Sequence, residues 1–249
     1  MTEAAVSQSH TNPLAGKRVL IVGGTSGIGL AAARQARDAG AKVTVVGSDR
    51  ERAKNVAAEN AFEGWRAADI TNTEAIYAAL ADVGHVDHLV LLAGSFVAGK
   101  VLVADVTYLR RAFEERIWAS VHVLRALGDK LASDASITFI SGALADRPNA
   151  YGTAVLAAAS AAMEAFARGL AVELAPRRVN TLSPGPIDTP ILSKTLGDGR
   201  DAYVQSLKQT LPLHRLGTAA EAGEAVVFLM GNGWMNGAVL NVDGGSRLV

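Results

Sequence analysis

A glycine-rich run is the first segment whose residue types and spacing point to chemistry: Gly23-Gly24-Thr25-Ser26-Gly27-Ile28-Gly29. It follows a short apolar run and precedes an amphipathic stretch, so we expect a strand, a tight turn and a helix. Glycines there permit a sharp bend and let the backbone approach a pyrophosphate, and the helix N-terminus favours the phosphate charge. The spacing predicts a dinucleotide-binding loop; the alternative is a tight turn without a ligand.

Candidates for proton transfer and charge stabilisation are fewer and lie apart in the sequence. Ser141 directly follows a predicted strand, Tyr151 comes ten residues later, and Arg116 falls within a long helical stretch. A tyrosine, with an ordinary pKa of about 10, needs a neighbouring cation to donate a proton near neutrality. Val155 follows Tyr151 by four residues, so no cation shares its helical face. A packing or subunit contact is therefore the alternative role for Tyr151.

Short apolar runs alternate with longer helical patterns along the whole chain. The expected strands are Arg18–Val22, Lys42–Val46, Trp65–Ala68, His88–Leu92, Ser136–Ile140, Val179–Leu182 and Ala238–Asn241. The expected helices are Ile28–Ala39, Arg50–Asn60, Thr73–Ala81, Val106–Ala132, Tyr151–Ala175, Asp201–Gln209 and Ala219–Met230. The strands are nearly continuous apolar runs, which is typical of a parallel sheet covered on both faces.

This alternation predicts an α/β fold with a doubly wound parallel β-sheet in a three-layer α/β/α arrangement. We expect one domain over residues 14–249, preceded by a flexible leader at residues 1–13. Ser183–Gly199 contains three prolines and few apolar positions, so it is predicted as a long loop. Because it leaves the carboxyl end of a strand, where ligands bind in such sheets, it is expected to act as a lid.

Composition excludes several classes of function. Lys+Arg and Asp+Glu both number 24, which argues against partners such as nucleic acid or an anionic membrane. Cysteine is absent, so disulfides, thiolate nucleophiles and cysteine-ligated metals are excluded. The histidines show no paired ligand spacing, so we expect no metal site. No apolar run approaches the roughly 20 residues of a membrane span and the start lacks a secretory signal, so we expect a cytoplasmic protein.

The chain resembles the short-chain dehydrogenase/reductase family from about Gly16 to Gly245. The matching pieces are GGTSGIG, Asp69-Ile70, Ala93-Gly94, Ser141, LAVELAP (Leu170–Pro176), RVNTLSPGPIDTP (Arg178–Pro190) and VDGG (Val242–Gly245). The resemblance implies a Rossmann-type domain that binds NAD(P) and an oxidoreductase activity on a small-molecule substrate. It also implies a homodimer or homotetramer.

The same resemblance implies where the cofactor binds. The glycine loop, with Gly23, Thr25, Ser26, Gly27, Ile28 and Gly29, is expected to hold the pyrophosphate. Asp69 and Ile70 are expected to bracket the adenine, and Ala93 and Gly94 to bring backbone next to the ribose. Pro184, Gly185, Ile187 and Thr189 are expected to meet the nicotinamide, with Thr189 donating to a phosphate or carboxamide oxygen.

The position that selects between NAD and NADP lies at the end of the second strand in this family, where an acid favours NAD. Here that position falls on Gly47, followed by Ser48, Asp49 and Arg50. A missing acid, a hydroxyl and a guanidinium favour the 2′-phosphate of NADP, so NADP(H) is preferred over NAD(H), although Asp49 opposes this choice. The alternative is that Ser48 and Asp49 only cap the next helix.

The proton-transfer residues of the family are missing. Leu156 stands at the position of the catalytic tyrosine and Ser160 at that of the lysine, and no Y-x-x-x-K occurs in the chain. Leu91-Leu92 replaces the usual asparagine pair, while Ser141 keeps its place.

Arg116 stands where the family has an asparagine. Its guanidinium could fill the polar cavity left beside the ribose by the lost lysine. The alternative is a solvated surface arginine near Arg110, Arg111 and Glu115.

These features leave three classes of function open. One is an NADP(H)-dependent oxidoreductase that transfers a hydride to a small organic carbonyl, imine or enone, with Ser141, Arg116, Tyr151 or water orienting the substrate. The second is a catalytically inactive NAD(P)-binding sensor or structural protein of the same fold. Non-redox chemistry in the same pocket is a third, because a fold does not fix a function.

Overall fold

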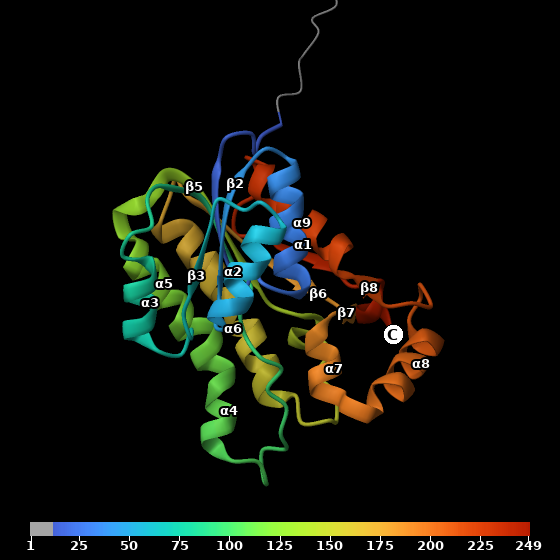
Figure 1. Cartoon of the computed structure of the whole chain (residues 1–249). Helices are drawn as coiled ribbons and strands as arrows, with labels where there is room; N and C mark the ends of the chain where they lie inside the picture. Colours follow the sequence, from blue (N-terminus) through green and yellow to red (C-terminus); the bar gives the residue numbers. More distant parts are fainter. Residues whose placement is uncertain (1–11) are drawn as a thin grey trace, which may run out of the picture.

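The computed structural model describes residues 12–249, and residues 1–11 of the predicted leader lie outside this range. Figure 1 shows a central sheet with helices on both sides. The sheet is formed by β1 (Arg18–Val22), β2 (Lys42–Gly47), β3 (Gly64–Ala67), β4 (Val86–Leu91), β5 (Leu131–Ile140), β6 (Arg178–Pro184) and β9 (Val239–Val242). Its strand order is β3-β2-β1-β4-β5-β6-β9, and every pairing in it is parallel. The predicted doubly wound parallel sheet is therefore confirmed.

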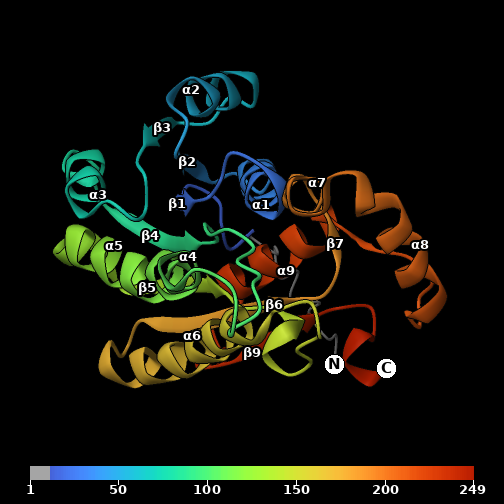
Figure 2. The ribbon, with the colours of Figure 1, turned by 90° about the horizontal axis from the view of Figure 1, so that it is seen from below.

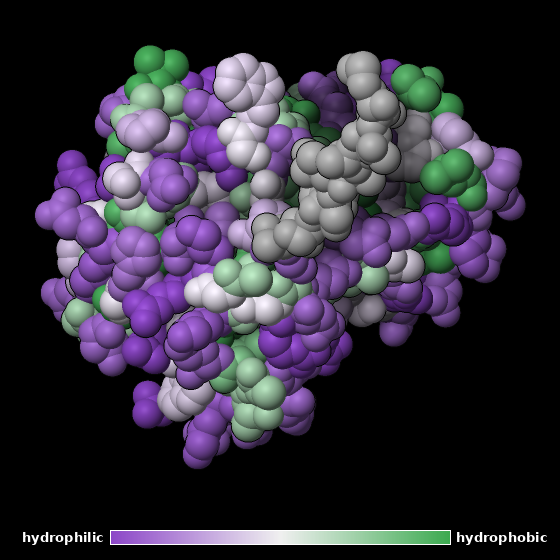
Figure 3. Space-filling model, turned by 90° about the horizontal axis from the view of Figure 1, so that it is seen from above, coloured by the Kyte–Doolittle hydropathy of each residue, from purple (hydrophilic) through white to green (hydrophobic). Residues whose placement is uncertain are grey.

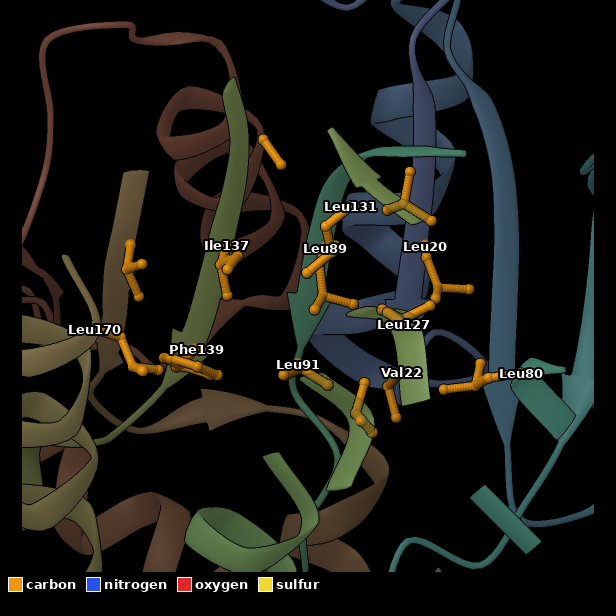
Figure 4. Packing of buried hydrophobic residues seen from close by; sticks show 14 of the residues in the cluster. Leu20, Val22, Leu80, Leu89, Leu91, Leu127, Leu131, Ile137, Phe139 and Leu170 are labelled. Atoms are coloured by element: carbon orange, nitrogen blue, oxygen red, sulfur yellow. The ribbon is translucent and has the colours of Figure 1, made fainter. Parts of the chain in front are cut away.

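The first strand shows why helices cover both faces. Val19 and Ile21 enter one hydrophobic core and Leu20 and Val22 enter the other, because successive strand side chains point to opposite faces. The first core packs against α1 (Gly27–Asp38), α2 (Arg50–Glu59) and α9 (Ala219–Gly231). The second packs against α3 (Thr73–Leu80), α5 (Ala119–Leu127) and α6 (Ala154–Glu173), as the labelled leucines of Figure 4 show.

The prediction of one continuous helix over Val106–Ala132 is wrong, because the segment is interrupted and its helical part ends earlier. It consists of α4 (Val106–Phe113), a π-helical turn at Glu114–Trp118, α5, and a 3₁₀ turn at Gly128–Lys130. Gly128 adopts a φ of +49°, which ends the helix, and β5 already begins at Leu131. Alanines and leucines suit either structure, so the pattern did not mark this boundary.

The segment predicted as a long loop carries structure of its own. It contains β7 (Ile187–Asp188) and α7 (Pro190–Leu196), and it is followed by α8 (Arg200–Thr210). β7 pairs with β8 (Gly217–Thr218) in a separate two-stranded sheet. Pro190 suits the first position of a helix, but α7 buries none of its residues, so hydrophobic periodicity did not reveal it. Figure 2 shows α7 and α8 beside the carboxyl ends of the strands.

α6 is long and apolar enough to cross a membrane by length and composition alone, contrary to the expectation that no stretch approaches that size. Within the fold it is a core helix, because Leu156, Met163 and Leu170 are buried. The end of the molecule opposite α7 and α8 is mainly hydrophilic, with small separate hydrophobic groups, as Figure 3 shows.

Candidate active site

The turn after β1 leaves no room for side chains at its key glycines. Gly23 has a φ of +86°, and a Cβ there would lie 2.7 Å from the backbone nitrogen of Ala93. A Cβ on Gly29 would lie 2.1 Å from the carbonyl oxygen of Gly23. The glycines therefore allow the turn to fold back on itself and to lie against the end of β4.

A cleft of about 630 Å³ opens at this turn. It is lined by predicted cofactor residues from separate segments, namely Gly23, Thr25, Ser26, Gly27, Ile28, Gly29, Ser48, Asp69, Ile70, Ala93, Gly94 and Thr189, and by Ser141. The carboxyl ends of parallel strands meet at one edge of the sheet, which brings these segments together. The sequence thus identified a contiguous set of cleft residues, although it missed others from the same segments.

The arginine at the β2 end of the cleft is Arg52, which sequence reasoning missed. Arg50 stands instead over the ring of Trp65, 5.0 Å from its centroid, and is not among the lining residues. Asp49 is the N-cap of α2, its carboxylate accepting from the backbone nitrogen of Arg52 at 2.9 Å, as the capping alternative expected. α2 begins at residue 50, and two residues correspond to roughly half a helical turn. Arg52 therefore faces the cleft, whereas Arg50 lies over Trp65.

Gly47 has no space for an acidic side chain. A Cβ at this position would lie 2.7 Å from Oγ1 of Thr25, which is itself buried. The close packing of Thr25 therefore gives a steric reason why no acidic side chain stands at position 47.

Asp69 lines the cleft with its carboxylate fixed in place. The backbone nitrogen of Thr71 donates to it at 2.9 Å and the Thr71 hydroxyl at 2.8 Å. These two hydrogen bonds lower the pKa of Asp69, assisted by the charge of Arg111. The carboxylate is thus a fixed acceptor at this end of the cleft.

A buried carboxylate supports the loop after β4. Glu115 is only 5% exposed and accepts from the backbone nitrogen and hydroxyl of Ser95, both at 2.6 Å. Arg111 completes the arrangement through its Nε, 2.8 Å from Glu115. All three residues line the cleft, so this hydrogen-bonded group forms part of its wall.

Arg116 turns inward rather than toward solvent, which makes the surface alternative wrong. Its Nη2 donates to the carbonyl of Ser95 at 3.0 Å and its Nη1 to that of Ala112 at 3.3 Å. A Cβ on Gly94 would lie 3.6 Å from Nη1, so the guanidinium lies directly beside the backbone expected at the ribose. Burial lowers the pKa of Arg116, and the charge of Glu115 opposes this.

A small cavity of about 10 Å³ adjoins this guanidinium, which also lines it together with Ser120. The Nε of Arg116 is buried and has no partner among residues 12–249. A cavity of this size suits one water molecule.

Ser141 points its hydroxyl at a carboxylate that the sequence analysis did not single out. Its Oγ donates to Oε1 of Glu164 at 2.7 Å, and the carbonyl of Ser160 lies 3.2 Å away. Glu164 follows Ser160 by one helical turn on α6, a spacing that could have identified it.

Leu156 and Ser160, which the resemblance is expected to align with the family's tyrosine and lysine, are closed to the cleft. Leu156 is 2% exposed and Ser160 is 3% exposed, and neither belongs to the cleft lining. α6 therefore presents buried side chains at these positions, and Glu164 is its acidic contact with Ser141.

Tyr151 lies outside the cleft lining and is 77% exposed. It precedes α6, which begins at Ala154 rather than at the predicted Tyr151. Burial raises the pKa of Tyr203 on α8, and the charge of Tyr151 adds to this. A general acid must reach the reacting atoms, so this position does not support the expected catalytic role.

Three of the residues expected at the nicotinamide are not among the residues that line the cleft, and their contact with a nicotinamide stays a prediction. Pro184 ends β6, Ile187 is buried in the core beneath α9, and a Cβ on Gly185 would lie 2.7 Å from Cα of Asp243. None of the three lines the cleft, whereas Thr189 does and packs on Gly27.

The loop after β5 is tied to the last residues of the chain. Asp146 pairs with Nε of Arg247 at 2.6 Å, and Arg147 donates to the carbonyl oxygen of Val249. Arg247 also pairs with Asp243 at 2.8 Å and donates to Ser183 at 2.6 Å. Within residues 12–249, no group of three histidine or acidic side chains is placed to hold a metal.

Comparison with known proteins places this geometry in a family. The family model described as enoyl-(acyl carrier protein) reductase matches residues 22–247. The short-chain dehydrogenase/reductase ATR9 of Stachybotrys chlorohalonatus is 32% identical, with 94% of this chain and 98% of that protein covered.

Two solved structures are similar over nearly their whole length. The MalC reductase/Diels-Alderase of Malbranchea aurantiaca is 25% identical with a TM-score of 0.88, covering 96% of this chain and 99% of that one. A small-chain dehydrogenase in complex with NADPH is 34% identical with a TM-score of 0.82, covering 94% and 100%. The chain therefore belongs to the short-chain dehydrogenase/reductase family.

Proposed function

We propose that the protein is an NADP(H)-dependent oxidoreductase that transfers a hydride to a small organic carbonyl, imine or enone through an altered active site. The observation that carries this proposal is the cleft that runs from the glycine turn to Ser141. The similar structure in complex with NADPH supports it.

The residues of the cleft fit a dinucleotide. The glycine turn admits backbone close to a pyrophosphate, since a Cβ on Gly29 would overlap the carbonyl of Gly23. Ser48 and Arg52 would hold a 2′-phosphate beside the N-terminus of α2. Asp69 and Ile70 would border the adenine. When bound, the reduced nicotinamide supplies a hydride.

The altered part of the site concerns proton transfer. Leu156 and Ser160 stand where the family has its tyrosine and lysine, and both are buried in packing. Ser141 would orient the substrate, and Arg116 would hold the ribose-side backbone through Ser95. Such a site suits acceptors that need no strong general acid.

For the substrate, the assembly and the location of the protein, the proposal keeps the expectations drawn from the sequence. We expect a small-molecule substrate, a homodimer or homotetramer, and a cytoplasmic location. The lack of cysteine in the sequence supports a reducing compartment.

Two neighbouring arginines provide a sharp test of the cofactor. Arg52→Ala should weaken NADPH binding by about 10- to 100-fold, because it removes a charge-assisted contact to the 2′-phosphate. Its NADH affinity should stay within about 2-fold. Arg50→Ala is the matched control, since Arg50 stacks on Trp65, and both nucleotides should bind to it as to wild type. Titration calorimetry measures all four affinities.

Turnover separates the enzyme from a cofactor-binding sensor. Oxidation of NADPH at 340 nm would be followed with a panel of ketones, cyclic imines and enones. Sustained turnover on one class supports the proposal. Tight NADPH binding without turnover on any class overturns it in favour of an inactive sensor, and a lack of affinity for both nucleotides overturns cofactor binding itself.

A further inference from the structure

The Ser141 end of the cleft, called the substrate end below, has a carboxylate next to it. This carboxylate belongs to Glu164, and the Ser141 hydroxyl donates to it. Oε1 of Glu164 accepts from Ser141 at 2.7 Å and lies 3.5 Å from the hydroxyl of Ser183. A serine hydroxyl has one proton to donate. Because Ser141 donates it to Glu164, the part of Ser141 left for a substrate is its lone pairs.

The hydrogen-bond network around Glu164 joins three carboxylates to one guanidinium. The guanidinium of Arg247 reaches this cluster through Ser183, at 2.6 Å from its hydroxyl. That guanidinium already pairs with two carboxylates, those of Asp146 and Asp243. Glu164 has no ion-pair partner of its own in the described part of the chain. The Arg247 guanidinium is thus already shared by Asp146 and Asp243, and Glu164 is linked to it only through Ser183.

We infer that Glu164 is a positioning residue that holds Ser141 as a hydrogen-bond acceptor, so that the site selects a cationic acceptor, an iminium, over a neutral ketone. This inference rests on the proposed hydride transfer and names its substrate class. A protonated imine has an N–H⁺ donor that matches the lone pairs of Ser141, and its positive charge is favoured by the carboxylate behind.

The reaction balances without a protein acid. The C–H bond at the nicotinamide of NADPH breaks with its electron pair, and a new C–H bond forms at the iminium carbon. The electrons of the C=N π bond become the lone pair of the amine nitrogen. NADPH is oxidised to NADP⁺ and the iminium is reduced to an amine, with no proton required in this step.

A neutral ketone poses the opposite requirement. Hydride addition turns its oxygen into an alkoxide, which needs a proton or a donor. Ser141 donates to Glu164 instead, and Leu156 offers no proton at the tyrosine position. The geometry of the site therefore disfavours this substrate.

Ligand binding tests the inference without turnover. The probes are 1,2,3,4-tetrahydroisoquinoline, which is a cation at neutral pH, and isochroman, its neutral analogue with oxygen in place of nitrogen. Calorimetry in the presence of NADP⁺ should show that wild type prefers the cation. Glu164→Gln keeps an oxygen for Ser141 but removes the charge, so it should weaken cation binding by about 10-fold or more. Its affinity for isochroman should stay within about 2-fold.

Matched variants keep the result interpretable. Glu173→Gln changes an exposed acid on the same helix and should keep the wild-type preference. Ser141→Ala removes the acceptor itself and should lose the preference as well. Unchanged NADPH affinity in Glu164→Gln shows that the variant folds. Wild-type preference retained in Glu164→Gln, or equal binding of both probes by wild type, would overturn the inference.

Turnover then separates this inference from the proposed function. With NADPH, 3,4-dihydroisoquinolinium should be reduced by wild type, and Glu164→Gln should lower kcat/KM for it by a larger factor than kcat/KM for cyclohexenone. Reduction of enones alone, unaffected by Glu164→Gln, supports the proposed function and overturns the inference. Selective cation binding without any turnover supports the site chemistry and overturns the proposed function.

Discussion

The two ends of the cleft are held in different ways. At the nucleotide end, the shape of the turn comes from lack of space: Gly23, Gly29 and Gly47 each lie where a Cβ would overlap a neighbour. At the substrate end, the shape comes from hydrogen bonds and ion pairs, with Glu164 and Arg247 joining segments far apart in sequence. A steric limit can be seen in the sequence because it requires a glycine. A polar network joins residues from distant segments, so no single segment of the sequence reveals it.

The largest effect should come from adding one methyl group at the steric end. Gly29→Ala would place a Cβ 2.1 Å from the carbonyl of Gly23, so the turn must move. We expect a loss of about 3 kcal/mol or more in the free energy of unfolding. Urea unfolding measures it, and calorimetry should show that the variant has lost NADPH affinity.

Gly169→Ala is the control for this substitution. Gly169 lies in α6 with nothing within 4 Å of an added Cβ, so the same change should stabilise the protein by about 0.5–1 kcal/mol. A similar effect of both substitutions would contradict the steric account of the turn.

An intermediate effect is expected at the contact between β4 and β5, in the middle of the sheet. Burial lowers the pKa of His88 to about 4, and its Nδ1 lies 2.7 Å from the hydroxyl of Ser136. The unfolded chain takes up a proton near an ordinary pKa of about 6.5. Stability from the neutral histidine is therefore present above pH 6.5 and lost as the pH falls toward 4, by a total of about 3 kcal/mol.

The measurement is urea unfolding of wild type and His88→Asn between pH 7.5 and 4.5. Asparagine retains a partner for Ser136 but does not titrate, so the gap between the two proteins should narrow or reverse at low pH. Parallel curves for the two proteins would show that His88 does not account for the loss.

The smallest effect is expected at an exposed ion pair of the substrate end. Nη2 of Arg200 lies 2.6 Å from Asp188 and links α8 to β7, but the two side chains are 29% and 56% exposed. Asp188→Asn should lower the free energy of unfolding by at most about 1 kcal/mol, and less at high salt. Asp198→Asn, at an exposed acid with no ion pair in the described residues, is the control. A loss as large as that of Gly29→Ala would remove the contrast between the two ends.

The sequence predicted the sheet and many of the residues that line the cleft at the glycine turn, for physical reasons. Buried parallel strands are continuous apolar runs, and the turn glycines mark the cleft directly. Arg52 rather than Arg50 lines the cleft, and the sequence did not show this because the helical phase depends on where Asp49 caps α2. Periodicity also did not show α7, which buries no residue.

The polar groups of the substrate end were harder to predict. Glu164 resembles any acid on an amphipathic helix until the fold brings Ser141 to it from a strand 23 residues earlier. Tyr151 was predicted as a catalytic residue because it is the tyrosine nearest to Ser141 in the sequence. In the structure it is exposed at the surface. Such long-range contacts are set by topology rather than by local spacing.

The attachment of the last residues to the loop after β5 has a practical consequence for recombinant work. Arg147 donates to the carbonyl oxygen of Val249, and Arg247 joins Asp146 to Ser183. A purification tag fused after Val249 would crowd this anchorage and disturb the groups next to Ser141.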